Sequence, residues 1–378
     1  MIIVIADDIT GAAEMGGIAL RYGLRVVVSD DVNADYKSDV LVVYTNARSM
    51  SKEEAVEVMV NISEKAMQLQ PSLFYKKTDS VLRGYILSEM KAQMKAMNVE
   101  KGLLIPANPS LGRVIKNGRY YVNNELIHQT GFSGDPEFPV TTSDVTEMLG
   151  NEDVPVKVIS KNQSLLENGI SVGEAVSSED MSQWARLENK SVLLAGGASF
   201  FNALLEKNHQ LKFTSGKLGD LSLPLVLISG TAFQKNVQQI KRYSNFVSYM
   251  PESLFSYDHR VAAGYEKWFD HIAAILSKYD RVIIAVNNDT GKKSNPILLR
   301  EKKAEIVKLI FKKIKIKELL IEGGSTAYSV IKGLGWHSFI PTEEIQQGIV
   351  RMQVCGLNDL HLTIKPGSYD WPAQWKFN

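Results

Sequence analysis

Residues 1–17 are MIIVIADDITGAAEMGG, and this stretch decides the fold class. Residues 2–5 form an uninterrupted apolar run of β-branched side chains, which is typical of a strand buried on both faces of a parallel sheet. Asp7 and Asp8 follow directly, and a segment rich in alanine, glycine and methionine continues with helical character to Leu20. A strand, an acidic turn and a helix in succession predict the first unit of a wound α/β sheet.

Asp7 and Asp8 have two interpretations. Ligands of open α/β sheets bind at the carboxyl ends of strands and beside helix N-termini, where adjacent carboxylates can act as a general base or hold Mg²⁺. Alternatively, such a residue is only the N-cap of the helix and accepts hydrogen bonds from free backbone N–H groups. The local pattern leaves both interpretations open.

The composition limits the classes of protein to which this chain could belong. With 378 residues, 44% hydrophobic and 22% charged, the chain is typical of a globular protein with two domains. The formal net charge of +1 gives no electrostatic basis for binding nucleic acid or an anionic membrane, so we expect neither partner. The sequence has no signal-peptide pattern and no membrane-spanning run, which favours a cytoplasmic protein. A single cysteine excludes an internal disulfide, and the six histidines show no metal-ligand spacing.

Strands and helices alternate through the first half of the chain. Ser51 and Glu54 form a capping-box pattern that starts a helix, and Pro71 stops it. Strands are expected at 24–29, 40–44, 73–75, 102–105, 156–159 and 192–195. A methionine stripe on one predicted helix is interpreted as core: Met90, Met94 and Met97. This alternation predicts a largely parallel sheet wound with helices.

Residues 107–142 interrupt the regular pattern with glycine, proline and polar residues. Their aromatic side chains argue against disorder, so we interpret the segment as an ordered flap over a site, with a hairpin through Asn123-Asn124. A polar, Gly/Lys-rich linker at 214–220 precedes a second α/β unit, whose tail at 349–364 is expected to form two strands. The predicted domains are therefore 1–222 and 223–378.

Charged residues follow three predicted strands of the first domain. The carboxyl ends of parallel strands lie on one edge of a sheet, so these charges should converge. Bases there could bind the carboxylate of a small hydroxylated anion, and an acid could take a hydroxyl proton. The residues are Asp7, Asp8, Arg48, Lys77, Asp79 and Arg83. Alternatively, Lys76-Lys77 is a solvated charge run and Arg83 belongs to an ordinary surface ion pair.

Small or glycine-rich turns follow three predicted strands of the second domain: Ser229-Gly230-Thr231, residues 288–291 and residues 323–326. Glycine lets the backbone approach a phosphate, and the following helix N-terminus supplies N–H donors. The alternative is that glycine only allows a tight strand-to-helix connection. The sequence contains neither a Walker P-loop nor a GxGxxG motif after a strand.

Four motifs in order resemble those of the four-carbon acid sugar kinase family: IADDITGAAE, TNAR ending at Arg48, KKTDSVLRG and PANPSLGR ending at Arg113. The second half is similar to the family through Ser229-Gly230, GGSTA at 323–327, Gly348 and the K-x-G pattern at 365–367. The resemblance covers nearly the whole chain. Ser325 is one of the positions at which the nucleotide side departs from the family pattern.

The resemblance implies a kinase that transfers a phosphoryl group from ATP to the 4-hydroxyl of D-threonate, D-erythronate or 3-oxo-tetronate. It implies a substrate-binding first domain, a nucleotide-binding second domain and an active site in the cleft between them. The substrate-facing residues would be Asp8, Arg48, Lys77, Thr78, Asp79, Ser80 and Arg83, with Asp8 or otherwise Asp7 as the catalytic group. The ATP-facing residues would be Ser229, Gly323, Gly324, Ser325, Thr326 and Gly348.

Mg²⁺ is expected from the reaction type, and the sequence identifies no ligands for it. The sequence also does not distinguish the three sugar acids or give an oligomeric state. A second hypothesis is a non-catalytic sugar-acid sensor that has lost its nucleotide chemistry. A dehydrogenase is disfavoured because the dinucleotide fingerprint is missing.

Overall fold

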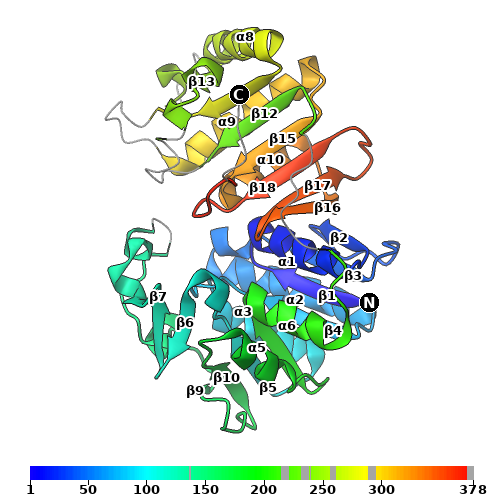
Figure 1. Ribbon diagram of the computed structural model, residues 1–378, viewed down its shortest axis with the longest axis vertical. Helices are drawn as coiled ribbons and strands as arrows, with labels where there is room; N and C mark the ends of the chain where they lie inside the picture. The colour runs from blue at the N-terminus through cyan, green and yellow to red at the C-terminus, as the bar shows by residue number, and fades with distance from the viewer. Residues whose placement is uncertain are drawn as a thin grey trace. The chain divides into compact units, whose positions relative to one another are not determined.

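The computed structural model describes residues 1–135, 138–213, 221–230, 238, 240–255, 261–287 and 295–372. The chain divides into two compact units, Met1–Thr214 and Ser215–Asn378, and each consists of a mainly parallel sheet with helices (Figure 1). The α/β class predicted from the sequence is thereby confirmed. The predicted linker at 214–220, Thr231 and the whole turn at 288–291 lie outside the described residues.

The sheet of the first unit has the strand order β2-β3-β1-β4-β11-β5-β10-β9, with every neighbouring pair parallel. The strands are β1 (Ile2–Ala6), β2 (Val26–Ser29), β3 (Val40–Tyr44), β4 (Leu73–Lys77), β5 (Lys101–Ile105), β9 (Val156–Ile159), β10 (Gly169–Gly173) and β11 (Val192–Gly196). The helices are α1 (Ile9–Arg21), α2 (Lys52–Gln68), α3 (Ile86–Met97), α4 (Val145–Leu149), α5 (Ser178–Ala185) and α6 (Ala198–Asn208). β1 therefore lies inside the sheet, paired with β3 and β4.

Local signals fix where the helices begin. Asp8 is the N-cap of α1, and Ser51 with Glu54 forms the predicted capping box of α2. Successive residues of β4 point to opposite faces of the sheet, because Lys76 pairs with Glu89 of α3 and Lys77 lies near Glu14 of α1. Helices α1 and α3 consequently cover opposite faces, with α6 beside α1 and α2 beside α3.

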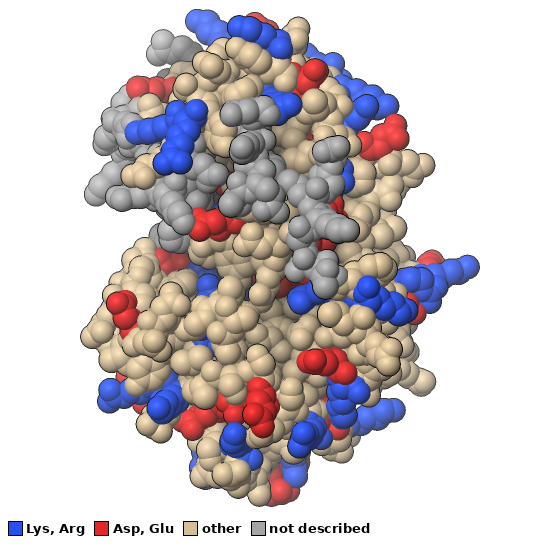
Figure 2. All heavy atoms as spheres, in the orientation of Figure 1, with Lys and Arg blue, Asp and Glu red and all other residues tan. Residues whose placement is uncertain are grey.

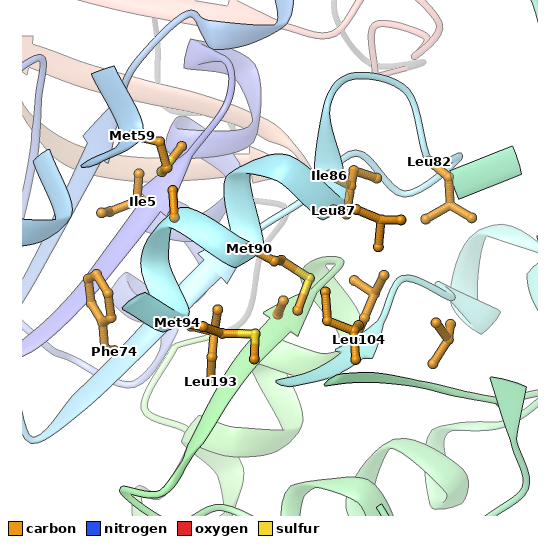
Figure 3. Packing of buried hydrophobic residues seen from close by; sticks show 14 of the residues in the cluster. Ile5, Met59, Phe74, Leu82, Ile86, Leu87, Met90, Met94, Leu104 and Leu193 are labelled. Carbon is orange, nitrogen blue, oxygen red and sulfur yellow. The ribbon is translucent and has the colours of Figure 1, made fainter. Parts of the chain in front are cut away.

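A large buried cluster of the first unit lies between the sheet and helices α2 and α3. Ile5 of β1 belongs to the same buried cluster as Met59 of α2. Met90 and Met94 project from α3 toward the strands that carry Leu104 and Leu193 (Figure 3). Burying each such side chain contributes about 1.5–3 kcal/mol to folding. The methionine stripe is core, as predicted, with Met97 partly buried against it.

The predicted flap contains a small antiparallel sheet in the order β6-β7-β8. Its strands are β6 (Arg113–Lys116), β7 (Arg119–Val122) and β8 (Glu125–Leu126). The predicted turn at Asn123-Asn124 joins β7 to β8, with φ of 50° and 69°, values that asparagine tolerates well. Tyr120 of β7 is completely buried, so the described part of the flap is ordered by packing.

The strand order of the second unit is β13-β14-β12-β15-β18-β17-β16. The strands are β12 (Leu225–Ser229), β13 (Val247–Tyr249), β14 (Arg281–Ala285), β15 (Glu318–Glu322), β16 (Ser338–Gln346), β17 (Ile349–Val354) and β18 (His361–Lys365). The helices include α8 (Val261–Tyr279), α9 (Pro296–Lys313) and α10 (Gly324–Leu334). β17 is antiparallel to both of its neighbours, so the two strands predicted for the tail are present and the sheet is mixed at that side.

Acidic and basic side chains of the described residues are interspersed on the face drawn in Figure 2, in keeping with the net charge of +1. Within the described ranges, no helix combines the length and apolarity needed to cross a bilayer.

A substitution at Gly196 tests how closely β11 packs against β5. Its φ is +156°, and a Cβ there would lie 2.1 Å from the carbonyl oxygen of Ile105. We expect Gly196→Ala to lower the free energy of unfolding by about 2 kcal/mol or more, because backbone atoms must move. Gly131→Ala is the control, since a Cβ at Gly131 meets nothing within 4 Å. Urea denaturation checks this, and equal stability of the two variants would contradict it.

Candidate functional site

Three carboxylates converge on the guanidinium of Arg48 in the first unit. Nε and Nη2 of Arg48 each lie 2.8 Å from Oδ2 of Asp7, directly after β1. Nη1 lies 3.4 Å from Oδ2 of Asp8 and 3.5 Å from Oδ1 of Asp79, which follows β4. The structure therefore brings together the charged strand ends that the sequence predicts to converge. The long Nη1 contacts leave this nitrogen able to donate to a further acceptor.

Asp7 and Asp8 differ in what their oxygens already bind. Oδ1 of Asp8 accepts the Gly11 N–H at 2.8 Å, and its Oδ2 accepts the hydroxyl of Thr10. Burial alone would raise the pKa of Asp8, but Arg48 and Lys77 outweigh it and lower that pKa. Oδ1 of Asp7 is buried and has no hydrogen-bond partner among the described residues. The N-cap interpretation thus holds for Asp8, and Asp7 carries the open acceptor.

Arg83 connects the site to the flap. Its Nε and Nη2 each lie 2.8 Å from an oxygen of Asp79, which is the bidentate geometry of a strong pair. Its Nη1 lies 2.7 Å from Oδ2 of Asp135, directly after the short helix η4 (Gly131–Gly134). Because Arg83 is held by two acids and its side chain is only 24% exposed, the surface-pair alternative does not describe it.

Thr78 and Ser80 lie in the loop that follows β4. The guanidinium of Arg113 donates to the hydroxyl of Ser80, and the hydroxyl of Tyr120 donates to the Ser80 carbonyl. Oγ1 of Thr78 is buried without a hydrogen-bond partner among the described residues. Two strands of the flap, β6 and β7, thereby hold the loop that contains the predicted substrate-binding residues.

Lys77 and its neighbour are not a solvated charge run, because both side chains are buried and each has an acid nearby. Nζ of Lys77 donates to the Thr78 carbonyl at 2.9 Å and lies 3.7 Å from Oε2 of Glu14. Burial raises the pKa of Glu14, and its Oε1 has no partner within the described ranges. Lys77 therefore retains donor capacity. Sequence reasoning missed Glu14, whose signal was an acid in an otherwise apolar helix.

Three neighbouring strands of the second unit end in one polar cluster. Ser229, Glu322 and Lys365 are aligned in register across β12, β15 and β18. The Ser229 hydroxyl donates to Oε2 of Glu322 at 2.8 Å, while Oε1 accepts from Trp371 Nε1 at 2.6 Å and lies 3.5 Å from Lys365 Nζ. Of these residues only Ser229 was predicted as a site residue, although Glu322 and Lys365 are also the last residues of their strands.

The glycine-rich turn lies directly after Glu322. Gly323, with φ of +92°, is the N-cap of α10, and no side chain caps the helix. Gly324, Ser325 and Thr326 form the first turn, whose backbone N–H groups and helix dipole favour an anion. A Cβ at Gly230 would lie 2.2 Å from Oγ1 of Thr326, so the two turns are in close contact.

Gly348 joins β16 to β17 with φ of +77°, a conformation that suits glycine in a tight turn. No group of three or more His, Cys, Asp or Glu side chains in the described part of the chain could hold a metal ion. Mg²⁺ bound with nucleotides usually takes phosphate and water oxygens with one or two carboxylates. We therefore assign no protein ligands to Mg²⁺.

Two family models match separate parts of the chain. Residues 2–204 match the family model of a sugar-binding N-terminal domain, and residues 226–369 match that of a nucleotide-binding C-terminal domain. A D-threonate kinase of Salmonella typhimurium is 31% identical over 222 residues, covering 53% of this chain and 52% of that protein. A 3-oxo-tetronate kinase of Pseudomonas fluorescens is 23% identical over 409 aligned positions, covering 97% of this chain and 93% of that protein.

The chain belongs to the four-carbon acid sugar kinase family. A D-erythronate kinase of Heliobacterium modesticaldum is also similar, at 27% identity over 39% of this chain and 35% of that protein. The match therefore spans about half of the length of the D-threonate kinase and about a third of the length of the D-erythronate kinase.

Two crystal structures share the fold of this chain. A protein of Salmonella typhimurium LT2 superposes with a TM-score of 0.78 at 19% identity, covering 98% of this chain and 96% of the other. The Haemophilus influenzae protein HI1011 gives a TM-score of 0.69 at 18% identity, with 97% of each chain covered.

Asp79 should make the stability of the first unit depend on acid pH. Burial alone would raise its pKa, but Arg83 and Arg48 lower that pKa well below the ordinary value. A depressed folded pKa contributes stability above the unfolded value of about 3.9, and this is lost as the pH falls below it. We expect Asp79→Asn to cost about 3 kcal/mol at pH 7, because two partly buried arginines lose a buried carboxylate partner.

The same variant should lose less further stability than the wild type between pH 5 and pH 3. Asp35→Asn is the control, since Asp35 is exposed. Urea denaturation at each pH measures both quantities. An unchanged acid profile in Asp79→Asn would show that Asp79 does not carry this pH dependence.

Proposed function

We propose that this protein is an ATP-dependent kinase that phosphorylates the 4-hydroxyl of a four-carbon sugar acid such as threonate, erythronate or 3-oxo-tetronate. The observation that carries the proposal is the cluster of acids around Arg48, in which one buried carboxylate oxygen is open, in a chain whose relatives are named sugar-acid kinases. A sugar acid carries hydroxyl groups that donate hydrogen bonds and one carboxylate that accepts them. The site offers matching groups: the open Oδ1 of Asp7 as an acceptor, and Arg48 and Lys77 as cations.

In this proposal the residues of the first unit bind the sugar acid. Lys77 and Nη1 of Arg48 have donor capacity for its carboxylate, and Asp8, Thr78, Asp79 and Ser80 line the same strand ends. Arg83, held by Asp79 and Asp135, positions the loop and the flap around the substrate. The flap is therefore a candidate for selecting among stereoisomers.

Asp7 is the favoured catalytic group. A general base must accept a hydrogen bond from the attacking hydroxyl, and Oδ1 of Asp7 is the unoccupied buried oxygen, whereas both oxygens of Asp8 have partners. The two contacts of Arg48 with Oδ2 of Asp7 fix the orientation of the carboxylate. Phosphoryl transfer requires mainly such positioning and charge stabilisation from the protein.

The second unit binds ATP in this proposal. The uncapped first turn of α10, from Gly324 to Thr326, offers N–H groups to phosphate oxygens, and Gly323 allows a close backbone approach. Ser229 ends the neighbouring strand β12 and bonds Glu322, the residue before Gly323. Gly348 is carried over from the family resemblance. Mg²⁺ accompanies the nucleotide as its counter-ion.

The direct test is ADP release. Purified protein is incubated with ATP–Mg²⁺ and a panel of four- to six-carbon sugar acids, and ADP is measured against an ATP-only background. At least one four-carbon acid should stimulate release. If the folded protein releases no ADP with any acid, the kinase proposal fails and a sugar-acid sensor becomes the better hypothesis.

A pair of matched variants tests the catalytic role. Asp7→Asn should reduce kcat by at least ~100-fold, the usual scale for losing a positioned acid–base group. Asp8→Asn should have a much smaller effect, because asparagine is an equally good N-cap. Thermal midpoints confirm that both variants fold. The reverse order of the two kcat values would assign the catalytic role to Asp8.

A further inference from the structure

Lys303 is a buried lysine on the inward face of α9. Its residue exposure is 5%, and Ile306 and Ile310 share that buried face. Lysine is almost never fully buried without a charged partner, because removing an ammonium group from water is costly. The position of this side chain therefore requires an explanation beyond packing.

Lys303 makes no direct ion pair with a carboxylate within the described ranges. Its Nζ donates instead to the main-chain carbonyl of Ser229 at 3.2 Å. Glu322 is the acid whose charge favours the ammonium form, but the oxygens of Glu322 already accept from Ser229 and Trp371. The Lys303 ammonium group therefore has N–H donors left for a further acceptor, and it shares no direct ion pair with Glu322.

The Ser229 carbonyl places this ammonium group at the carboxyl end of β12. Gly230 follows directly, and the position of a Cβ on Gly230 lies 2.2 Å from Oγ1 of Thr326 in the first turn of α10. That first turn has no side-chain cap. A buried cation that makes no direct ion pair with a described residue and uncapped helix N–H groups therefore occur around one turn, and both favour an anion.

We propose that Lys303 is a phosphate-binding residue of the nucleotide site, where its ammonium group pairs with a phosphate oxygen beside the first turn of α10. This inference rests on the proposed function, because it names a residue of the same nucleotide site. Nothing in the family motifs pointed to Lys303, which lies on a helix between the predicted turns.

The charge of Lys303 gives nucleotide binding a characteristic pH dependence. Burial, together with Arg300 on the same helix, lowers the pKa of Lys303 to about 8 against the opposing effect of Glu322 at the end of β15. A bound phosphate favours the charged form and raises this pKa. Above pH 8 the free protein must therefore take up a proton when it binds nucleotide, and affinity falls as the pH rises.

Calorimetric titration with ADP in the absence of sugar acid tests the inference without turnover. Lys303→Met should weaken ADP binding by roughly tenfold to a hundredfold, the range for a charge-assisted hydrogen bond. Its nucleotide-free thermal midpoint should be unchanged or higher, because a desolvated charge is removed. Lys308→Met is the matched control, since Lys308 lies on the exposed face of the same helix. The control should bind ADP like the wild type.

The outcomes separate the inference from the proposed function. A wild type that binds no ADP would refute the nucleotide site itself. Wild-type binding with an unchanged Lys303→Met affinity would overturn the role of Lys303, and a lowered midpoint in that variant would identify a structural residue instead.

A second measurement uses only the wild-type protein and so does not depend on a variant folding. Titrations at pH 8.5 in two phosphate-free buffers of different ionisation enthalpy count the protons exchanged on ADP binding. Net proton uptake is expected, and none should be seen at pH 7, where Lys303 is already charged. Absence of uptake at pH 8.5 would overturn the inference.

Discussion

The contacts of Arg48 with three aspartates are the interaction on which the site of the first unit depends. Asp7, Asp8 and Asp79 could not be buried side by side without a cation between them, because like charges in a poorly solvated place repel strongly. Arg48 supplies that cation from the end of another strand. Arg83 adds a second positive charge and joins the cluster to the flap. Charge compensation thus determines both the position and the remaining binding capacity of these side chains.

The second unit uses charge at its strand ends in a different way. Ser229, Glu322 and Lys365 compensate one another in register across three parallel strands. This cluster includes Glu322, which directly precedes the turn at Gly323, and none of its side chains caps the first turn of α10. Lys303 is the contrasting case, since it makes no direct ion pair with an acid in the described part of the chain. The charges of the Ser229, Glu322 and Lys365 cluster largely compensate one another, and Lys303 nearby makes no ion pair with a described residue. This is the arrangement expected of an anion-binding site.

Much of the fold could be predicted because its signals are local. The apolar run of β1, the capping box of α2 and the methionine stripe of α3 each depend on neighbours within a few residues. Four strands were missed: β6, β10, β13 and β16. β13 has only three residues, Val247–Tyr249, which is too short for a clear pattern. β10 is only GISVG, with a glycine at each end, and β6 and β16 lie in polar, irregular sequence and are stabilised by cross-strand pairing.

From the sequence it was possible to predict which strand ends of the site carry charged residues. Its pairing was not, because the partners of Lys77, Arg83 and Lys303 lie far away in the sequence or on other elements. The difference between Asp7 and Asp8 likewise depends on which oxygens are already occupied. Adjacent identical side chains in a sequence give no information on that point.

Binding of a sugar acid in the absence of nucleotide is the most direct measurement on the first site. Calorimetric titration should compare D-threonate, D-erythronate and 3-oxo-tetronate with threitol and erythritol, which carry hydroxyl groups and lack the carboxylate. Saturable binding of at least one acid, with no detectable binding of either alditol, is the expected result. If none of the three acids binds, or if an alditol binds as tightly as the acids, the charged cluster around Arg48 is not a sugar-acid site.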